Sequence, residues 1–262
     1  LSGRMMPRVP LHESFLTIPL AHRGYHDLAE GRPENSLSAF GAALRAGYGI
    51  ELDVQQTADG RAVVFHDDDL DRLSVATGPV RNHTATALNA VRLRGGNETI
   101  PTLEEVLGLV AGRVPLLIEI KENLDTMADT EGRLERAVAD ALKNYQGPVA
   151  VMSFNPHAVA HMARLAPGIA RGLTTESYIP EQSLPIPPSV CERLREIPDY
   201  DVTASSFISH QASDLARPRV AALKAQGASV LCWTIRSVEA EAEARKIAHN
   251  ITFEDYPAEI PA

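Results

Sequence analysis

The sequence has few cysteines. Among 262 residues only Cys191 and Cys232 are cysteines, and each lies beside apolar residues without a partner at the spacing of a metal site. A disulfide scaffold and a zinc site are therefore not expected, and a reducing compartment is compatible with this cysteine content.

The sequence also lacks an excess of basic residues. It contains 25 Lys and Arg residues against 34 Asp and Glu residues, which gives a formal net charge of −9. A protein that binds a nucleic-acid backbone displaces counterions with clustered basic side chains. The charge balance therefore argues against a nucleic-acid partner.

Long apolar runs are missing from the N-terminus. Residues 1–20 contain no continuous apolar stretch of the length that a signal peptide or a membrane span needs. We therefore expect a cytoplasmic protein without stable membrane insertion. The chain begins with Leu1 rather than Met, so a cleaved leader stays open as an alternative.

Strand and helix patterns alternate along the chain, which favours a parallel sheet. We count about eight units, and a single (β/α)8 TIM barrel typically takes about 250 residues. We therefore predict one barrel domain over residues 1–262. Strands are expected near residues 16–21, 50–54, 62–65, 114–120, 148–152, 169–173, 201–204, 230–234 and 251–253, and residues 174–188 are expected to be a loop.

Residues 67–99 interrupt this alternation. They are rich in Asp and Gly and have weak apolar periodicity, so we predict a small insertion after the second strand unit. Helical patterns resume at Thr102, where Thr102 and Glu105 have the spacing of a capping box. Elsewhere Asn35 or Ser36 is expected to cap one helix, and Asn155 another.

The central stretch of the chain is a short apolar run with two acidic residues. Residues 50–54 have the length and the β-branched content of a buried strand. Glu51 and Asp53 are two residues apart, so in a strand they point to the same side. Two buried carboxylates repel each other and lose hydration, which is costly unless a cation lies between them. The next apolar run leads directly to His66.

Reactive residues recur at or near the carboxyl ends of the expected strands. In a parallel barrel these ends share one face, and that face carries the chemistry. Any one of them alone is better explained as a cap, a turn residue or a core residue, and a surface ion pair would account for Lys121. Their convergence is what favours a site. The residues are His22, Arg23, Glu51, Asp53, Glu119, Lys121, Trp233 and Asp255.

The residue types in this set suit phosphoryl chemistry. Glu51, Asp53 and Glu119 offer only oxygen ligands, which suit one hard cation such as Mg2+ or Ca2+. A divalent cation together with Arg and Lys can neutralise a phosphoryl transition state. Two histidines can divide the work of a general base and a general acid.

Ordered motifs over most of the chain resemble the glycerophosphodiester phosphodiesterase family. They run from about residue 21 to residue 257. They are His22-Arg23-Gly24, Pro33-Glu34-Asn35-Ser36 with Ala39-Phe40, Glu51-Leu52-Asp53-Val54, Thr57-Ala58-Asp59-Gly60, His66-Asp67 with Leu70-Asp71-Arg72, Ile100-Pro101-Thr102-Leu103-Glu104-Glu105-Val106-Leu107, Ile118-Glu119-Ile120-Lys121, Ser153-Phe154-Asn155, Trp233-Thr234 and Asp255-Tyr256-Pro257.

The resemblance implies a (β/α)8 barrel that hydrolyses glycerophosphodiesters to glycerol 3-phosphate and an alcohol. For some relatives it also implies a cyclic phosphate formed by the substrate's own hydroxyl. The residue roles that it implies are these: metal ligands Glu51, Asp53 and Glu119; acid–base residues His22 and His66; phosphate contacts Arg23 and Lys121; and Glu34 in support at the same mouth.

The chain departs from the family pattern near its last strand. Glu254 stands where relatives often carry Thr, which puts the role of Asp255 in question. Trp233 is read as either a core residue or part of the substrate site. Two other functions stay open: hydrolysis of lysophospholipids or other phosphodiesters, and a non-catalytic barrel that binds a phosphorylated ligand. A homo-oligomer is also left open.

Overall fold

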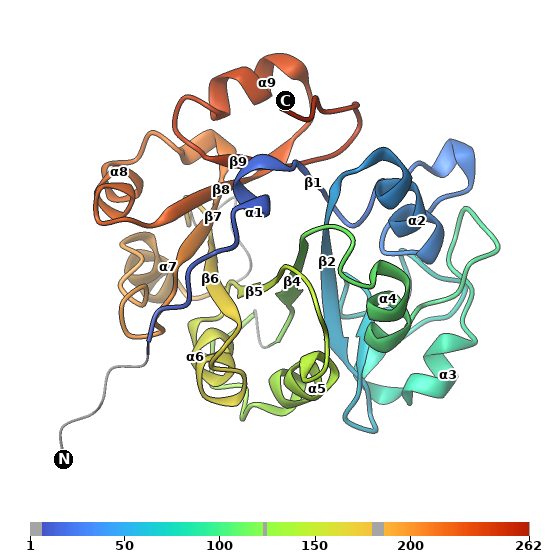
Figure 1. Cartoon of the computed structure of the whole chain (residues 1–262). Coiled ribbons are helices and arrows are strands. Elements are labelled where there is room, and N and C mark those ends of the chain that lie inside the picture. Colours follow the sequence, from blue (N-terminus) through green and yellow to red (C-terminus); the bar gives the residue numbers. More distant parts are fainter. Residues whose placement is uncertain (1–6, 123–124, 180–185, 262) are drawn as a thin grey trace.

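Eight parallel strands form a closed ring in the computed structural model, which describes residues 7–122, 125–179 and 186–261 (Figure 1). The ring closes because β1 pairs with the last strand, β9, and also with β2. The strands of the ring are β1 (Leu20–Ala21), β2 (Gly49–Gln56), β4 (Leu116–Ile120), β5 (Val149–Ser153), β6 (Ala170–Thr175), β7 (Phe207–Gln211), β8 (Ser229–Ile235) and β9 (Asn250–Phe253).

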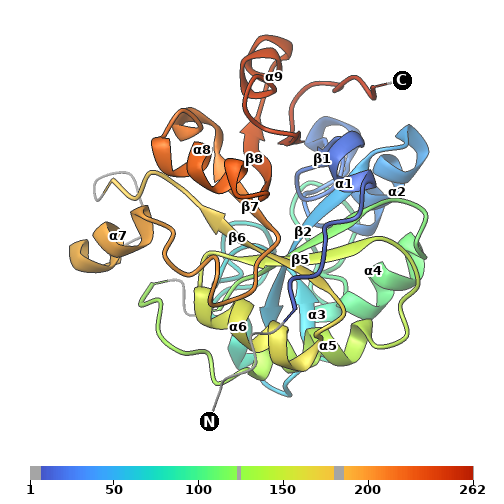
Figure 2. The same ribbon diagram turned by 60° about the vertical axis from the view of Figure 1, so that its left-hand side comes forward.

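Helices lie outside this ring (Figures 1 and 2), which confirms the predicted (β/α)8 TIM barrel. Ser36, Thr102 and Asn155 cap their helices as predicted, and Thr102 forms the full capping box with Glu105. The helices between strands are α2 (Leu37–Ala46), α4 (Leu103–Val110), α5 (Arg133–Leu142), α6 (Pro156–Leu165), α7 (Pro188–Arg195), α8 (Pro218–Ala225) and α9 (Val238–Ala244).

The amino-terminal end of the barrel is closed by apolar side chains. The short helix α1 (Ser14–Thr17) places Phe15 against residues at the starts of the strands, among them Leu117 and Phe207. The side-chain amide of Asn250, in β9, donates hydrogen bonds to the carbonyls of Phe15 (2.8 Å) and Ile18 (2.7 Å). The opposite end of the barrel, where the parallel strands have their carboxyl ends, is not closed by this cluster.

The predicted strand over residues 201–204 is wrong, and the real strand is β7. Residues 201–204 form a turn in which Ala204 has a positive φ and the Thr203 hydroxyl donates to the Asp199 carbonyl (2.7 Å). β7 was missed because Ser209 and His210 interrupt its apolar pattern, although both are fully buried. β6 also extends through Thr175, into the expected loop, and residues 180–185 of that loop lie outside the described part.

Residues 67–99 lie between β3 (Ala62–Val64) and α4. β3 is antiparallel to the end of β2, beyond the residues of β2 that pair with β1, so it lies outside the ring. The segment contains α3 (Ala85–Asn89) and the 3-10 helix η2 (Val80–Asn82) and packs around its own apolar cluster. We interpret it as an insertion into a single barrel domain. The remaining 3-10 helices are η1 (Leu28–Glu30) and η3 (Ala212–Asp214).

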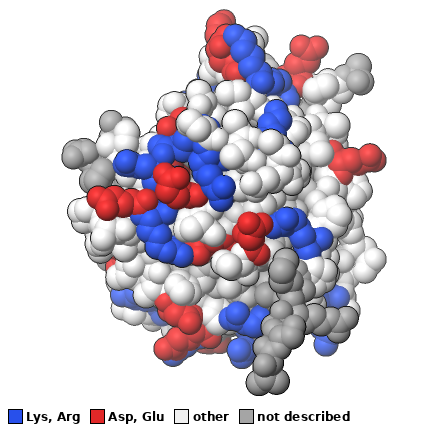
Figure 3. Space-filling view, turned by 90° about the vertical axis from the view of Figure 1, so that its left-hand side faces the viewer, with Lys and Arg blue, Asp and Glu red and all other residues white. Residues whose placement is uncertain are grey.

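Opposite charges lie side by side on one face of the molecule. On the face drawn in Figure 3, Lys and Arg side chains lie beside Asp and Glu side chains rather than in a basic patch. Arg193 with Asp199 (2.6 Å) and Arg8 with Asp201 (2.7 Å) are such pairs. Within the described residues, no helix combines the length and the apolar character needed to cross a membrane.

Candidate active site

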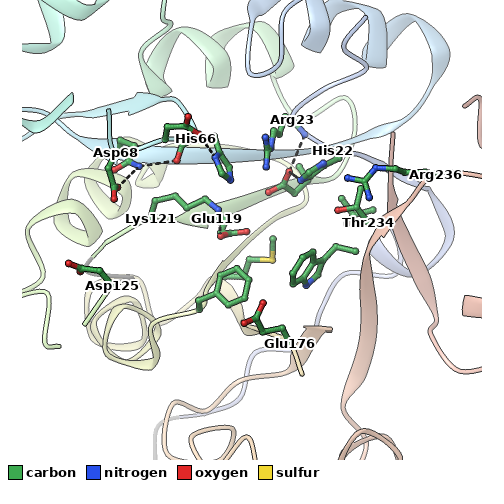
Figure 4. A pocket seen from close by; sticks show the side chains of 17 residues that line it. His22, Arg23, His66, Asp68, Glu119, Lys121, Asp125, Glu176, Thr234 and Arg236 are labelled. Carbon is green, nitrogen blue, oxygen red and sulfur yellow. Dashed lines mark hydrogen bonds and ion pairs between the residues drawn. The ribbon is translucent and has the colours of Figure 1, made fainter. Parts of the chain in front are cut away.

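A cavity of about 670 Å³ lies at the carboxyl end of the barrel (Figure 4). Figure 4 shows charged and imidazole side chains from several strands pointing into it. Of the predicted site residues it is lined by His22, Arg23, Glu51, His66, Glu119, Lys121 and Trp233.

Three carboxylates meet at one side of this cavity. Asp53 and Glu119 are register partners on the neighbouring strands β2 and β4, and Glu51 lies two residues earlier on the same face of β2. One carboxylate oxygen from each of the three lies within 4.8 Å of the others, and all three residues are buried. The sequence prediction that these side chains converge is therefore confirmed.

Positive charges neutralise this cluster only in part. Lys121 Nζ lies 3.2 Å from Asp53 Oδ1 and 2.6 Å from Glu119 Oε1, and Arg23 Nε lies 3.5 Å from Asp53 Oδ2. The amide of Asn35 donates to Asp53 Oδ2 (2.9 Å). Burial would raise the pKa of Asp53, but the charges of Lys121 and the other cations outweigh it and hold that pKa well below its usual range.

Glu51 has the opposite behaviour. Burial, followed by the negative charges of Asp53 and Glu119, raises the pKa of Glu51 well above its usual value. A divalent cation among the three carboxylates would favour their ionised forms, and an all-oxygen donor set matches Mg2+ or Ca2+. The residues present therefore fit a hard cation at this position.

His22 is placed by a sharp turn at the end of β1. Its backbone N–H donates to the Phe253 carbonyl (2.9 Å), and the next two residues, Arg23 and Gly24, both have positive φ. A Cβ on Gly24 would lie 2.9 Å from the Phe40 ring, so this turn requires glycine. His22 Nε2 lies 4.0 Å from Glu51 Oε2, and burial lowers the pKa of His22 despite an opposing contact with Glu254.

His66 also lines the cavity and comes from the segment just after β3 (Figure 4). Its Nδ1 lies 2.7 Å from Asp67 Oδ1, and Arg72 holds Asp67 with two contacts of 2.7 Å. Burial raises the pKa of Asp67, but Arg72 and His66 outweigh this effect and bring it well below its usual range. The imidazole of His66 thus has a carboxylate neighbour that Arg72 holds in place.

Glu34 does not line the cavity but holds a residue that does. It accepts a hydrogen bond from Arg23 Nη1 (2.7 Å) and lies 3.2 Å from Arg72 Nη2. Burial raises the pKa of Glu34, yet Arg23 and Arg72 bring it below its usual value. Glu34 thus contacts the predicted phosphate residue Arg23 without lining the cavity itself.

Part of the remaining wall of the cavity is apolar, and Glu176, Thr234 and Arg236 also line it. Phe154 and Trp233 pack edge to face with their ring centroids 5.6 Å apart, and Met152 lies beside them. The indole N–H of Trp233 donates to the Ser209 carbonyl (3.0 Å), which fixes the ring. Trp233 is therefore a wall of the cavity as well as a packed side chain.

Comparison with known proteins identifies the family. The family model described as "Glycerophosphoryl diester phosphodiesterase family" matches residues 22–259. The chain belongs to this family. The match covers every residue of the predicted site, and it confirms the resemblance drawn from the motifs.

Individual relatives of the family agree. A glycerophosphodiester phosphodiesterase of Caldanaerobacter subterraneus subsp. tengcongensis is 34% identical over 60% of this chain and 66% of its own length. One of Bacillus altitudinis is 35% identical over 63% of this chain and 69% of its own length. The chain thus aligns with about two thirds of the length of these relatives.

A solved structure of a relative is similar to this chain over nearly its whole length. An Oleispira antarctica phosphodiesterase, solved in complex with the product sn-glycerol-3-phosphate, has a TM-score of 0.73 and 27% identity. The alignment covers 93% of this chain and 95% of that one.

Two acidic residues of this family member differ from the sequence-based picture. Asp255 was expected on the reactive face, but its side chain is 62% exposed and does not line the cavity. Its neighbour Glu254, noted only as a departure from the family pattern, instead contacts His22 Nδ1 at 2.5 Å. Only strand pairing between β1 and β9 could have revealed this contact, because 232 positions separate the two residues.

Proposed function

We propose that this protein is a metal-dependent phosphodiesterase that hydrolyses glycerophosphodiesters to glycerol 3-phosphate and an alcohol. The observation that carries the proposal is that one cavity brings a cluster of three carboxylates, two of which line it directly, together with Arg23, Lys121 and two histidines. Family membership and the product bound to the Oleispira antarctica relative support the same reaction.

We assign the cation to Glu51, Asp53 and Glu119. When bound, it would supply positive charge to a phosphoryl oxygen. Arg23 and Lys121 stand beside these carboxylates and would contact the remaining phosphate oxygens. Both now form ion pairs with the cluster, so a bound cation would share the carboxylates with them.

His22 and His66 would move the protons. One imidazole takes the proton of the attacking oxygen as a new P–O bond forms. The other gives a proton to the alcohol oxygen as the old P–O bond breaks, so that water is added across the ester overall. The wall of Trp233, Phe154 and Met152 would cover the carbon skeleton and keep water from it.

The test is release of glycerol 3-phosphate from glycerophosphocholine and glycerophosphoethanolamine with Mg2+ or Ca2+. We expect turnover that is lost when EDTA removes the metal and restored when excess metal is added back. Glu51→Gln, which keeps the size of the side chain and removes one charged ligand, should lower kcat by about 100-fold or more. A lysophospholipid arm tests the alternative substrate class.

A control variant outside the cavity makes this assay decisive. Glu104→Gln changes a surface glutamate that pairs with Arg61 (3.2 Å) outside the cavity, so it should leave turnover unchanged. Inactivity on every glycerophosphodiester with either metal, or full activity in the presence of EDTA, would overturn the proposal. Metal-dependent binding of glycerol 3-phosphate without turnover would instead favour a non-catalytic barrel.

A further inference from the structure

Barrel closure brings two segments of the site together from opposite ends of the chain. β1 pairs in parallel with β9 in the register Ala21 with Phe253, so the residues that follow these strands lie side by side. Those residues are His22 and Glu254. The family match and the predicted set of site residues give Glu254 no role.

We propose that Glu254 is a positioning residue that holds His22 in the tautomer with the proton on Nδ1 and the Nε2 lone pair facing the cavity. The proposal rests on the proposed function for the role of His22. It concerns how this chain prepares its imidazole before any substrate binds.

The first support is the hydrogen bond itself. His22 Nδ1 lies 2.5 Å from Glu254 Oε2, and the two side chains are 14% and 13% exposed. An ionised carboxylate can only accept hydrogen bonds, so the ring nitrogen must be the donor. Nε2 of the neutral ring then carries the lone pair, and it is this atom that lies 4.0 Å from Glu51 Oε2.

The second support is that Glu254 is itself held as a carboxylate. Arg236 contacts Glu254 Oε1 through Nε (2.8 Å) and Nη2 (2.6 Å), and His26 Nε2 lies 3.4 Å from Oε2. Burial raises the pKa of Glu254, but its contacts with His22, His26 and Arg236 outweigh burial and bring that pKa well below its usual range. The acceptor therefore stays ionised and keeps one orientation.

The neighbouring acid provides a contrast. Asp255 has a positive φ and an exposed side chain, and Arg236 Nε lies 3.7 Å from its Oδ2. One residue thus reaches the imidazole and the next does not. The pair Glu254 and Asp255 offers a test variant and a matched control at adjacent positions.

The experiment compares Glu254→Gln with Asp255→Asn. The amide of glutamine can either donate or accept, so it no longer imposes a tautomer on His22. We expect Glu254→Gln to lower kcat by about 10–100-fold with KM changed by less than about threefold. Asp255→Asn, whose new side chain tolerates positive φ, should behave like the wild type. Glu254→Asp, which keeps the carboxylate, should retain more activity than Glu254→Gln.

A direct readout is the 15N chemical shift of the two ring nitrogens of His22, assigned with His22→Asn. The wild type should show a protonated Nδ1 and an unprotonated Nε2 at neutral pH, and Glu254→Gln should show both tautomers. A wild type with the proton on Nε2 would overturn the proposal, and so would an unchanged kcat in a folded Glu254→Gln variant.

The two proposals can fail separately. The tautomer of His22 is measured on the wild-type protein without substrate, so it stands even if no glycerophosphodiester is turned over. Thermal unfolding of Glu254→Gln shows whether the variant is folded. If the variant is unfolded, the 15N spectrum of the wild type still shows which ring nitrogen of His22 carries the proton.

Discussion

The two histidines of the cavity make the same kind of side-chain contacts, but the residues that they contact come from different parts of the chain. Each imidazole contacts a carboxylate through Nδ1, and each carboxylate is held by an arginine. We call these sets the closure relay and the local relay. The closure relay consists of His22, Glu254 and Arg236, and the local relay consists of His66, Asp67 and Arg72.

The relays differ in chain distance and in their connections. The local relay spans seven consecutive positions, whereas the closure relay depends on the pairing of the first and last strands. Arg72 also contacts Glu34 (3.2 Å), which in turn holds Arg23, so the local relay is coupled to a predicted phosphate contact. In the closure relay, Arg236 contacts Glu254 and lies 3.7 Å from Asp255. A histidine, a carboxylate and an arginine can thus be brought together by a short sequence motif or by the pairing of strands that are far apart in the sequence.

Removing either imidazole should lower the activity more than any other change to the two relays. We expect His22→Ala and His66→Ala each to lower kcat by about 10²–10⁴-fold, because each removes a proton-transfer group. The double variant should be little worse than the weaker single variant, since the two groups act in one reaction. Steady-state kinetics with glycerophosphocholine measures this, and a fully active double variant would contradict the acid–base pair.

A substrate with a better leaving group separates the two roles. In the p-nitrophenyl ester of glycerol 3-phosphate the departing oxygen needs no proton, so the variant that lacks the general acid should recover activity and the other should not. Recovery of both variants, or of neither, would argue against a division of labour between the relays.

Removing the arginines should have a smaller effect that is unequal between the relays. Arg72→Ala releases both Asp67 and Glu34, so we expect kcat/KM to fall by about tenfold. Arg236→Ala leaves His26 near Glu254 and should cost less. Arg61→Ala, at an exposed arginine outside the cavity, is the control. Equal losses for Arg72→Ala and Arg236→Ala would show that the link to Glu34 is unimportant.

The smallest expected effect concerns stability at acid pH. The pKa of Asp67 is lower in the folded state than its usual value of 3.8, so the folded protein binds fewer protons than the unfolded chain. The stabilisation from this carboxylate is therefore present above pH 3.8 and is lost as the pH falls below that value.

Asp67→Asn tests this. At pH 6 the variant should be less stable than the wild type by about 1–2 kcal/mol, and the difference should shrink at pH 3. Urea unfolding at the two pH values measures the free energies. Glu254→Gln should show the same direction, because the pKa of Glu254 is also lowered. A difference that grows at acid pH would contradict the assigned shifts.

Much of the fold could be predicted from the sequence, because its helix and strand periods are locally encoded. Caps such as Thr102 and Asn155, together with the alternation of strands and helices, indicated the barrel. β7 could not be recognised, since a barrel strand is buried on both faces and Ser209 and His210 hide its apolar pattern. His210 bonds Thr175 (2.7 Å) on the neighbouring strand, a partner that only the fold supplies.

In the candidate site, too, some residues could be predicted from the sequence and others could not. Glu51 and Asp53 could be predicted because two positions in one strand share a face, and Glu119 because parallel strand ends share one end of a barrel. The local relay lies within motifs that were visible in the sequence. Glu254 was not assigned, because a predicted closed barrel places the last strand beside the first but does not give the register between them. Which of two adjacent acids faces inward also depends on backbone angles near Asp255.

The pairing of β9 with β1 has a consequence for the order in which parts of the candidate site form during folding. The carboxylates that would hold the cation come from the neighbouring strands β2 and β4, which are much closer in the sequence than β1 and β9. Glu254 reaches His22 only when β9 pairs with β1, across a separation of 232 positions. Closing a long loop costs more conformational entropy than closing a short one, so we expect the support of His22 to form after the carboxylate cluster when the chain folds.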